Sequence, residues 1–265
     1  MDVARKLITK INGPGHTLGV LATDHAWAEL PAVLQSAGLD YLIVDMEHGA
    51  YADDTVAHIC TSGRQVGFPV LIRTVSTDYP IVRRAVDLGP CGLMFPCVES
   101  PAQLDAVRDA VWMPPRGRRR PGGHGNRWVS DYHYETWRES FEDDFIVLPQ
   151  IESKRGLANL DAIARHELTT ALAVGPYDLS ADLGCCWRPR DARLQEALGQ
   201  IRGAAKAASK KVWMLGDAPA LAEEGYTFLA IGEPSVMLKL YAKQIAERIK
   251  GGARAPETSL AAEHG

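Results

Sequence analysis

The chain has 265 residues, of which 46% are hydrophobic and 24 are glycine, enough to bury the core of one large domain. Its formal net charge of −4 gives no overall attraction to nucleic acid, and no stretch approaches the roughly 20 apolar residues of a membrane span. Five cysteines without a CxxC pair argue against a disulfide framework. We therefore expect reduced cysteines, a cytoplasmic location and a small-molecule partner, with no nucleic-acid or membrane partner.

Short apolar runs that end in glycine, proline or a charged residue recur along the chain and predict β-strands. They lie at residues 17–22, 41–47, 69–74 and 92–97, and four more begin near residues 145, 169, 211 and 228. Segments with helical spacing lie between them, and several end in glycine. Eight such alternations predict an α/β fold, a single (β/α)8 barrel domain over residues 1–250. A doubly wound sheet is the alternative, but no GxGxxG follows an early strand.

Two segments do not fit a minimal barrel. Residues 112–144 exceed the usual length of a connection, so we interpret them as a functional or a mobile loop. The basic run Arg116–Arg120 in this loop is either simply solvated or attracts a second carboxylate of a substrate. Residues 251–265 have the composition of a disordered tail.

Charged and polar side chains gather at the ends of the predicted strands. The active site of a (β/α)8 barrel is built at the C-terminal ends of its strands, so we expect most of these side chains to point into one cup. In chain order they are Asp45, Glu47, His48, Arg73, Gln150, Glu152 and Asp178.

Each of these residues also has a simpler interpretation. Arg73 could brace the rim by pairing with a carboxylate. Glu152 and Asp178 could cap helices or face their N-terminal dipoles, and His48 could be a structural hydrogen-bond donor. Their convergence on one face favours a catalytic site, because separate accidents would have to place all of them there.

Two carboxylates with open coordination positions suit a hard divalent ion. Glu152 and Asp178 are the pair that could hold an ion such as Mg²⁺ or Mn²⁺. A closed zinc site built from Cys185, Cys186 and His166 lacks the usual ligand spacing.

Four sequence blocks resemble the motifs of the HpcH/HpaI aldolase family: VDMEHG, LIRT, LPQIES and AVGPYDLSADLG. The similarity runs in order from about residue 17 to 245, and the family includes 2,4-dihydroxyhept-2-ene-1,7-dioate and 2-keto-3-deoxyglucarate aldolases. The resemblance implies a (β/α)8 (TIM) barrel of the phosphoenolpyruvate/pyruvate superfamily type. It also implies a C-terminal helix exchanged between the subunits of a homo-trimer or homo-hexamer, and residues 234–250 have amphipathic spacing that suits such a helix.

The resemblance also implies roles for single residues. Glu152 and Asp178 match the ligands of a divalent metal ion, Mg²⁺, Mn²⁺ or Co²⁺. Arg73 matches the arginine that stabilises the enolate, which suits a fixed guanidinium. His48 matches the catalytic histidine, and Asp87 matches the aspartate that pairs with it, from within the chain or across a subunit interface.

Three further positions carry over in the same way. Asp45 matches the acid near the metal-bound water, and Gln150 matches the glutamine beside the metal. The backbone amides around Tyr177 and Asp178 match those that hold the carboxylate of pyruvate.

The implied activity is that of a metal-dependent aldolase, a carbon–carbon lyase that cleaves or forms a 4-hydroxy-2-oxo acid. Its products are pyruvate, formed through a metal-bound enolate, and an aldehyde. His48 would take the 4-hydroxyl proton, and no lysine Schiff base is needed. An oxaloacetate decarboxylase or macrophomate synthase-like enzyme using the same enolate is the alternative. Two further alternatives are a lyase of the citrate-lyase type that acts on CoA esters and a non-catalytic barrel that binds a sugar acid.

Overall fold

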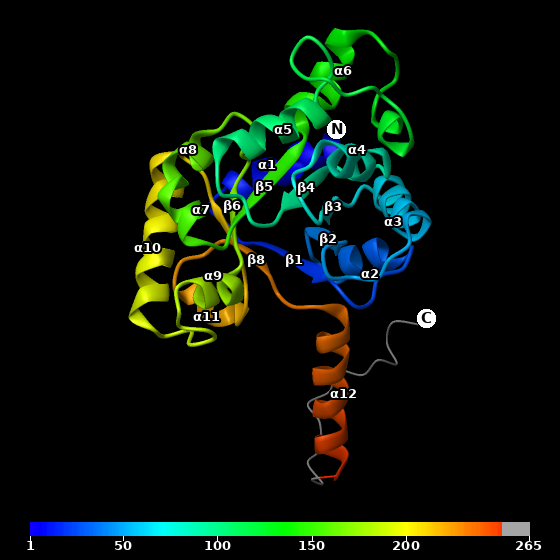
Figure 1. Cartoon of the computed structure of the whole chain (residues 1–265). Helices are drawn as coiled ribbons and strands as arrows, with labels where there is room; N and C mark the ends of the chain where they lie inside the picture. Colours follow the sequence, from blue (N-terminus) through cyan, green and yellow to red (C-terminus); the bar gives the residue numbers. More distant parts are fainter. Residues whose placement is uncertain (251–265) are drawn as a thin grey trace.

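The computed structural model describes residues 1–250, which form eight parallel strands closed into a barrel in sequence order, with β1 paired to β8 (Figure 1). The predicted (β/α)8 barrel is confirmed, and the predicted tail lies outside the described residues. The strands are β1 (Thr17–Ala22), β2 (Tyr41–Asp45), β3 (Val70–Arg73), β4 (Gly92–Phe95), β5 (Ile146–Ile151), β6 (Leu172–Val174), β7 (Val212–Leu215) and β8 (Phe228–Ala230).

Helices alternate with the strands, and most of them cover the outside of the barrel. They are α1 (Asp2–Asn12), α2 (Leu30–Ser36), α3 (Asp53–Val66), α4 (Tyr79–Asp87), α5 (Pro101–Val111), α6 (Tyr134–Ser140), α7 (Lys154–Ala158), α8 (Leu160–Arg165), α9 (Pro176–Asp182), α10 (Ala192–Ala207), α11 (Ala218–Glu223) and α12 (Pro234–Lys250), with short 3₁₀ turns η1 (His124–Trp128) and η2 (Glu142–Asp144). β2 and β5 are buried at every residue, because helices cover one face and the packed interior covers the other.

Tyr41 fills the interior of the barrel. Its hydroxyl donates to the Leu229 carbonyl at 2.7 Å and accepts from Trp213 Nε1 at 2.8 Å, and its ring meets Phe228 edge-on with centroids 5.1 Å apart. Gly19 leaves the necessary room, since a Cβ there would overlap the Tyr41 ring. The interior is therefore a packed core, and ligands are confined to the strand ends.

The segment 112–144 and helix α1 pack together at the end of the barrel where the strands begin. The Met1 ammonium and the Arg5 guanidinium both bind the Asp144 carboxylate, at 2.6 and 2.8 Å. Within the segment, Trp137 and Phe141 are fully buried with ring centroids 5.2 Å apart. The sequence pattern predicted neither α1 nor the helices of this segment, which local aromatic packing and ion pairs hold in place.

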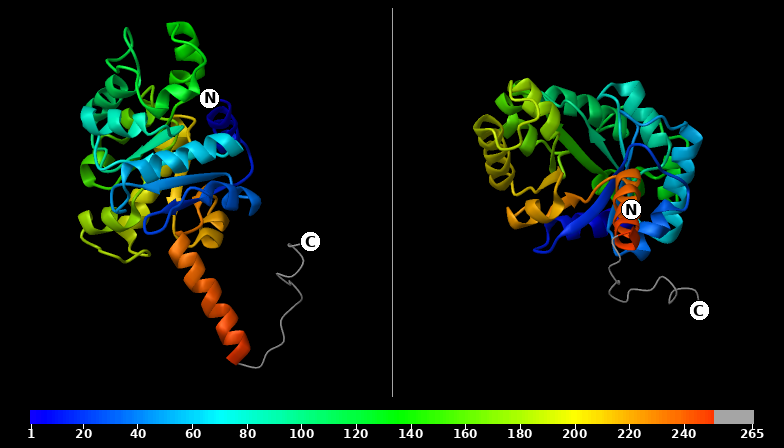
Figure 2. Two further views of the ribbon diagram at one scale, coloured as in Figure 1. Left: turned by 90° about the vertical axis from the view of Figure 1, so that its right-hand side faces the viewer. Right: turned by 90° about the horizontal axis from the view of Figure 1, so that it is seen from below.

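Helix α12 projects away from the barrel (Figures 1 and 2). Its span confirms the helix predicted over residues 234–250, but it buries no residue within the described chain. Its large exposed apolar side chains are Val236, Leu238, Leu240, Tyr241 and Ile249. Among residues 1–250, no helix combines the length and apolar character that crossing a membrane requires.

Candidate active site

A buried ion pair between Asp45 and Arg73 forms one side of the site. The two residues are direct neighbours in the β2–β3 register, so both side chains leave the C-terminal ends of their strands. Arg73 Nε and Nη2 donate to the two carboxylate oxygens of Asp45 at 2.8 and 2.6 Å. Burial alone would raise the pKa of Asp45, but the hydrogen bonds and charge of Arg73 outweigh it and lower the pKa. Asp45 is therefore ionised and fixes the plane of the guanidinium.

The turn after β2 is built around the same carboxylate. Asp45 Oδ1 accepts the backbone N–H groups of Glu47 and His48 at 3.0 and 3.4 Å, and Thr23 Oγ1 donates to Oδ2 at 2.8 Å. Gly49 closes the turn, because a Cβ there would overlap the carbonyl oxygen of Asp45. The block VDMEHG therefore encodes a tight turn that presents Glu47 and His48 at the rim.

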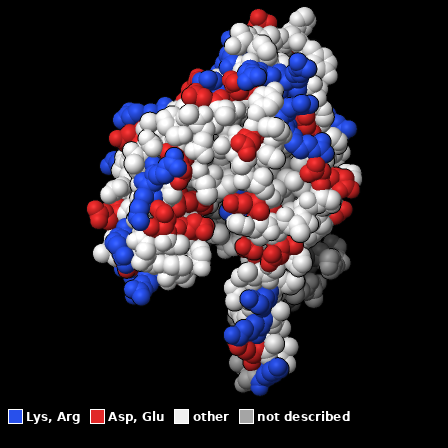
Figure 3. All heavy atoms as spheres, viewed as in Figure 1, with Lys and Arg blue, Asp and Glu red and all other residues white. Residues whose placement is uncertain are grey.

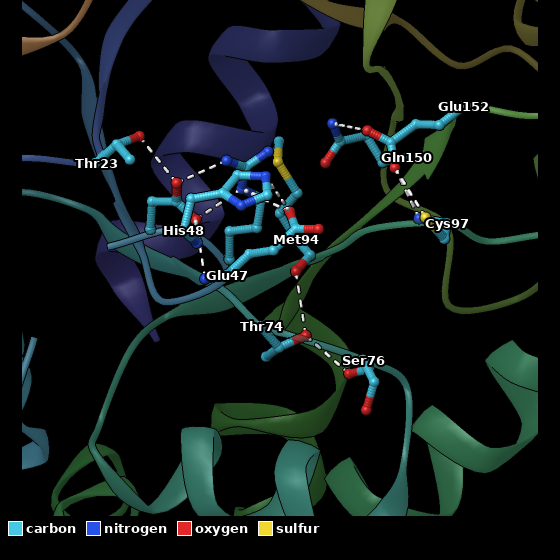
Figure 4. Close-up of polar contacts among 11 residues, drawn as sticks. Thr23, Glu47, His48, Thr74, Ser76, Met94, Cys97, Gln150 and Glu152 are labelled. Carbon is cyan, nitrogen blue, oxygen red and sulfur yellow. Dashed lines mark hydrogen bonds and ion pairs between the residues drawn. The ribbon is translucent and has the colours of Figure 1, made fainter. Parts of the chain in front are cut away.

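Glu47 takes part in the site, although the sequence reasoning gave it no role of its own. Its Oε2 lies 3.3 Å from Arg73 Nε and 3.7 Å from His48 Nε2 (Figure 4). Burial raises the pKa of Glu47, and the negative charge of Glu152 adds to this increase. The positive charge of Arg73 offsets only part of the increase. The His48 side chain is 62% exposed, so its imidazole can reach a substrate at the mouth. The position of Glu47 two residues after the end of β2 was the available signal.

Glu152 forms the other side of the site, at the end of β5, and is only 6% exposed. Its Oε2 accepts the backbone N–H of Cys97 at 2.9 Å, and Gln150 Nε2 donates to its Oε1 (Figure 4). Gly175 in the turn after β6 is required, because a Cβ there would overlap Glu152 Oε1. Gly175 of the GPYDLS motif therefore makes room for the Glu152 carboxylate, which belongs to the LPQIES motif.

Burial raises the pKa of Glu152, the hydrogen bonds from Cys97 partly offset it, and the negative charge of Asp178 adds to it. Asp178 is carried by the α9 turn that follows Gly175, the glycine packed against Glu152 Oε1. The capping interpretation is wrong for Glu152, because Ser153 is the N-cap of α7 and its side chain accepts a backbone N–H. Asp178 lies exposed in the first turn of α9. Tyr177 is 55% exposed beside it, with its ring 5.7 Å from Trp187.

The donor set around Glu152 fits a hard divalent ion. Gln150 turns its amide nitrogen to Glu152 Oε1, and its buried Oε1 has no hydrogen-bond partner within residues 1–250, so one buried acceptor near the strand ends is left unmatched. No group of three or more His, Cys, Asp and Glu side chains able to hold a metal exists within residues 1–250. Two carboxylates and a buried amide oxygen suit an ion that completes its shell with water and substrate oxygens.

Asp87 does not join the other predicted residues within one chain. It ends α4, which runs back from the C-terminal end of β3, so it lies at the opposite end of the barrel from His48. There it accepts a hydrogen bond from Arg119 Nη2 at 3.0 Å and lies 3.8 Å from Arg83 Nε. Its pairing with a histidine across a subunit interface stays a prediction.

The basic run Arg116–Arg120 lies at that same end. Arg116 Nη1 binds Glu142 and Asp143 at 3.2 and 2.8 Å, and its guanidinium stacks on Trp112. Arg119 is fully buried between aromatic rings. Within one chain Arg116 and Arg119 therefore serve local packing, whereas Arg118 and Arg120 are exposed to solvent. An attraction for a second substrate carboxylate would require a neighbouring subunit.

Comparisons with known proteins identify the family and agree with the barrel fold. Residues 23–238 match the family described as HpcH/HpaI aldolase/citrate lyase. A hydroxypyruvate/pyruvate aldolase of Pseudomonas aeruginosa is 34% identical over 244 residues, covering 88% of this chain and 87% of the relative. A 2-dehydro-3,6-dideoxy-6-sulfogluconate aldolase of Pseudomonas putida is 32% identical over 239 residues, covering 88% and 92%. The crystal structure of an HpcH/HpaI aldolase from Desulfitobacterium hafniense superposes with a TM-score of 0.82 at 24% identity, covering 95% and 98%.

Proposed function

Because the chain belongs to the HpcH/HpaI aldolase/citrate lyase family, we propose that it is a metal-dependent aldolase that cleaves or forms a 4-hydroxy-2-oxo acid, with pyruvate and an aldehyde as the other reactants. One observation carries the proposal: the buried Asp45–Arg73 pair faces the buried carboxylate of Glu152 across the strand ends. A fixed cation beside a cluster of oxygen donors suits a 2-oxo acid and the negative charge that develops on it.

Glu152 and Asp178 would hold the divalent ion, and the amide of Gln150 would lie beside it. When bound, a Mg²⁺, Mn²⁺ or Co²⁺ ion supplies Lewis-acid charge that polarises the 2-oxo group. The backbone N–H groups at the start of α9, around Tyr177 and Asp178, would bind the substrate carboxylate, because the first N–H groups of a helix have no intrahelical partner.

Arg73 is set up to bind the 2-oxo oxygen. In residues 1–250 its Nε and Nη2 are engaged by carboxylates, whereas no hydrogen bond or ion pair occupies Nη1. Asp45 holds the guanidinium plane, so Nη1 keeps a fixed direction as charge develops on the oxygen. The bond is therefore stronger to the enolate than to the substrate, which is the condition for catalysis.

His48 is the base in this scheme. It takes the proton of the 4-hydroxyl, the C3–C4 bond breaks, and the bonding electrons move into the three-carbon fragment, which becomes pyruvate after protonation at C3. Glu47 lies 3.7 Å from His48 Nε2, where its charge stabilises the imidazolium that forms. The exposed position of His48 lets the aldehyde half of the substrate extend toward solvent.

A second copy of the chain is proposed to cover the exposed apolar side chains of α12, in a homo-trimer or homo-hexamer working in the cytoplasm. Such packing would bury Leu238 and Leu240, which are more than half exposed in one chain. It would also allow Asp87 of one subunit to approach His48 of another. Sedimentation of the wild type and of a Leu238→Asp, Leu240→Asp variant tests this, and a wild-type monomer with full activity would contradict it.

The activity is tested with a panel of 4-hydroxy-2-oxo acids, each assayed for pyruvate release with Mg²⁺, Mn²⁺ or Co²⁺ and after chelation. We expect metal-dependent release from at least one substrate. Turnover of oxaloacetate alone would favour the decarboxylase, and binding of a sugar acid without turnover would favour the non-catalytic barrel. Full activity after chelation would contradict the metal role.

A further inference from the structure

A cavity of about 610 Å³ opens at the end of the barrel where the strands begin. It lies between the last turn of α10, the residues that lead into β7 and the turn before β8, so it is at the opposite end from the candidate active site. Four cations line it: Arg202, Lys206, Lys210 and Lys211. Its lining contains no Asp or Glu among residues 1–250, although the whole chain carries a net charge of −4.

Acidic side chains do not balance these four cations. No ion pair within the described part of the chain involves any of them, and Glu224, the acid beside the turn before β8, lines a different cavity. Burial lowers the pKa of Lys210, and no carboxylate offsets this effect. Gathering like charges in a partly buried cavity is unfavourable until an anion joins them. The cavity therefore has the electrostatic character of an anion site.

Arg202 is held in place beside the cavity. Its guanidinium lies over the ring of Tyr226, 4.8 Å from the ring centroid, and Tyr226 is only 4% exposed. A cation–π contact with a buried ring restricts the side chain without neutralising its charge. Less conformational entropy is then lost when the arginine binds an anion.

Ser209 adds a hydroxyl to the lining at a position where glycine is usual. The Ser209 and Lys210 N–H groups donate to the carbonyls of Lys206 and Ala205 at 3.0 and 2.8 Å, which closes α10 through a left-handed residue. Ser209 has a φ of 57°, whereas the left-handed residues after α3 and α9 are Gly67 and Gly184. Strained residues of this kind often belong to binding sites, and here the strain keeps a hydroxyl in the lining.

We propose that this cavity binds a chain of linked phosphates, either inorganic or carried by a nucleotide. One phosphate monoester carries only about −1.5 to −2 charges at pH 7, fewer than the four cations present. Linked phosphates place several charges close together and accept hydrogen bonds from lysine, arginine and hydroxyl groups at once. The inference goes beyond the proposed aldolase function and does not depend on it, because the cavity and the strand ends lie at opposite ends of the barrel.

Calorimetric titration with inorganic triphosphate tests the proposal, in buffer without added divalent ions. We expect one site per chain, with an affinity that falls as salt is added. Lys206→Ala combined with Lys210→Ala should weaken binding by at least roughly tenfold, because two charged donors are lost. Lys6→Ala combined with Lys239→Ala is the matched control, since it removes the same charge outside the cavity and should leave the affinity within about twofold.

The outcomes decide between a site and a general attraction. Equal losses in the two double variants, or no binding by the wild type, would overturn the site. Citrate bound as tightly as triphosphate would overturn the choice of phosphate. A parallel titration with ATP distinguishes the two sources: tighter binding than triphosphate identifies a nucleotide, and equal or weaker binding identifies inorganic polyphosphate.

Ser209→Gly separates binding from folding, because the two effects have opposite signs. Glycine adopts the left-handed conformation without strain, so the melting temperature should rise. The lost hydroxyl should weaken triphosphate binding by a few-fold over the same range of salt. A more stable variant with unchanged affinity would overturn the role of Ser209 as a ligand-binding residue.

Discussion

Two buried glutamates lie at opposite ends of the barrel in opposite electrostatic surroundings. Glu142, in the segment 112–144, is 3% exposed, and burial raises its pKa. It accepts the backbone N–H of Met113 at 2.6 Å and lies 3.2 Å from Arg116 Nη1. The buried charge of Glu142 is therefore balanced by Arg116, which belongs to the same segment.

Glu152 is also buried, and its pKa is also raised, but within residues 1–250 it accepts hydrogen bonds only from neutral groups, those of Cys97 and Gln150. Asp178 adds a second negative charge, and Arg73, whose positive charge partly offsets the effect, is already held by Asp45. Acidic side chains gather near the base of α12 in Figure 3, whereas basic side chains are prominent near α4 and α6. The buried charge of Glu142, which a cation balances, is structural. The buried charge of Glu152 at the strand ends lacks a cation of its own and is available to a ligand.

The sharpest test exchanges each glutamate for glutamine. Glu152→Gln should lower pyruvate release by at least roughly 10³-fold, because it removes a charged ligand of the ion. Glu142→Gln removes an equally buried charge at the other end and should leave turnover within a few-fold of the wild type. Steady-state assays at saturating metal measure both. Equal losses in the two variants would contradict the distinction.

The two halves of the mechanism should separate in a second pair of variants. His48→Ala should lower aldol cleavage by roughly 10²–10⁴-fold, as expected for a lost general base. Oxaloacetate decarboxylation should suffer less, because that substrate has no 4-hydroxyl proton to remove. Arg73→Ala should damage both reactions, since both pass through the enolate. If His48→Ala reduced both equally at unchanged metal affinity, His48 would be a positioning residue.

A third test asks whether the two ends of the barrel meet across a subunit interface. Asp87→Ala and His48→Ala should each be inactive alone, and mixing them after dissociation and reassembly should recover activity. The reason is that some interfaces then combine an intact Asp87 with an intact His48. Pyruvate release by the mixture, compared with each variant alone, measures it. No recovery in a mixed oligomer verified by mass spectrometry would restrict Asp87 to its local pairing with Arg119.

Acid should weaken metal binding through Glu152. Burial raises the pKa of Glu152 above its ordinary value of 4.5, so the carboxylate takes up a proton at a higher pH than an exposed glutamate does. Below that raised pKa, Mn²⁺ affinity should fall by up to about tenfold per pH unit, because the ion must displace the proton. Calorimetric titration across the acid range measures it.

The raised pKa of Glu152 also makes the folding stability of the metal-free protein depend on pH. The folded metal-free protein holds the proton more tightly than the unfolded chain, so stability should fall as pH rises from 4.5 through the raised pKa. Saturating Mn²⁺ should offset this loss. Thermal unfolding with and without the ion measures it, and a pH-independent melting temperature of the metal-free protein over this range would contradict it.

The smallest effect is expected at Glu142, in the segment 112–144, where a substitution should change only the free energy of unfolding. Glu142→Ala leaves the buried Met113 N–H without its acceptor and removes one of the two carboxylates that bind Arg116, which should cost about 1–3 kcal/mol. Thermal unfolding should therefore shift down by several degrees. Asp143→Ala is the matched control, because Asp143 binds the same arginine but is exposed and should cost less than about 1 kcal/mol.

The sequence by itself determined the barrel, because alternation of apolar runs and helical spacing is a local pattern that each segment carries. It also determined that Asp45, Arg73 and Glu152 share one face, since the C-terminal ends of parallel strands meet there. The amphipathic spacing of residues 234–250 likewise predicted α12 correctly.

Only the tertiary structure decided which of these groups touch. The pairing of Arg73 with Asp45 depends on the β2–β3 register, and the approach of Glu152 depends on the absence of a Cβ at Gly175. Cys97 reaches Glu152 through one left-handed residue, which no periodicity encodes. Asp87 matches the family motif, yet within one chain it lies at the opposite end of the barrel from His48, because the helix that follows a strand runs back along it. Distances between residues far apart in sequence follow from register, turn conformation and chain direction, and these are fixed only when the segments pack together.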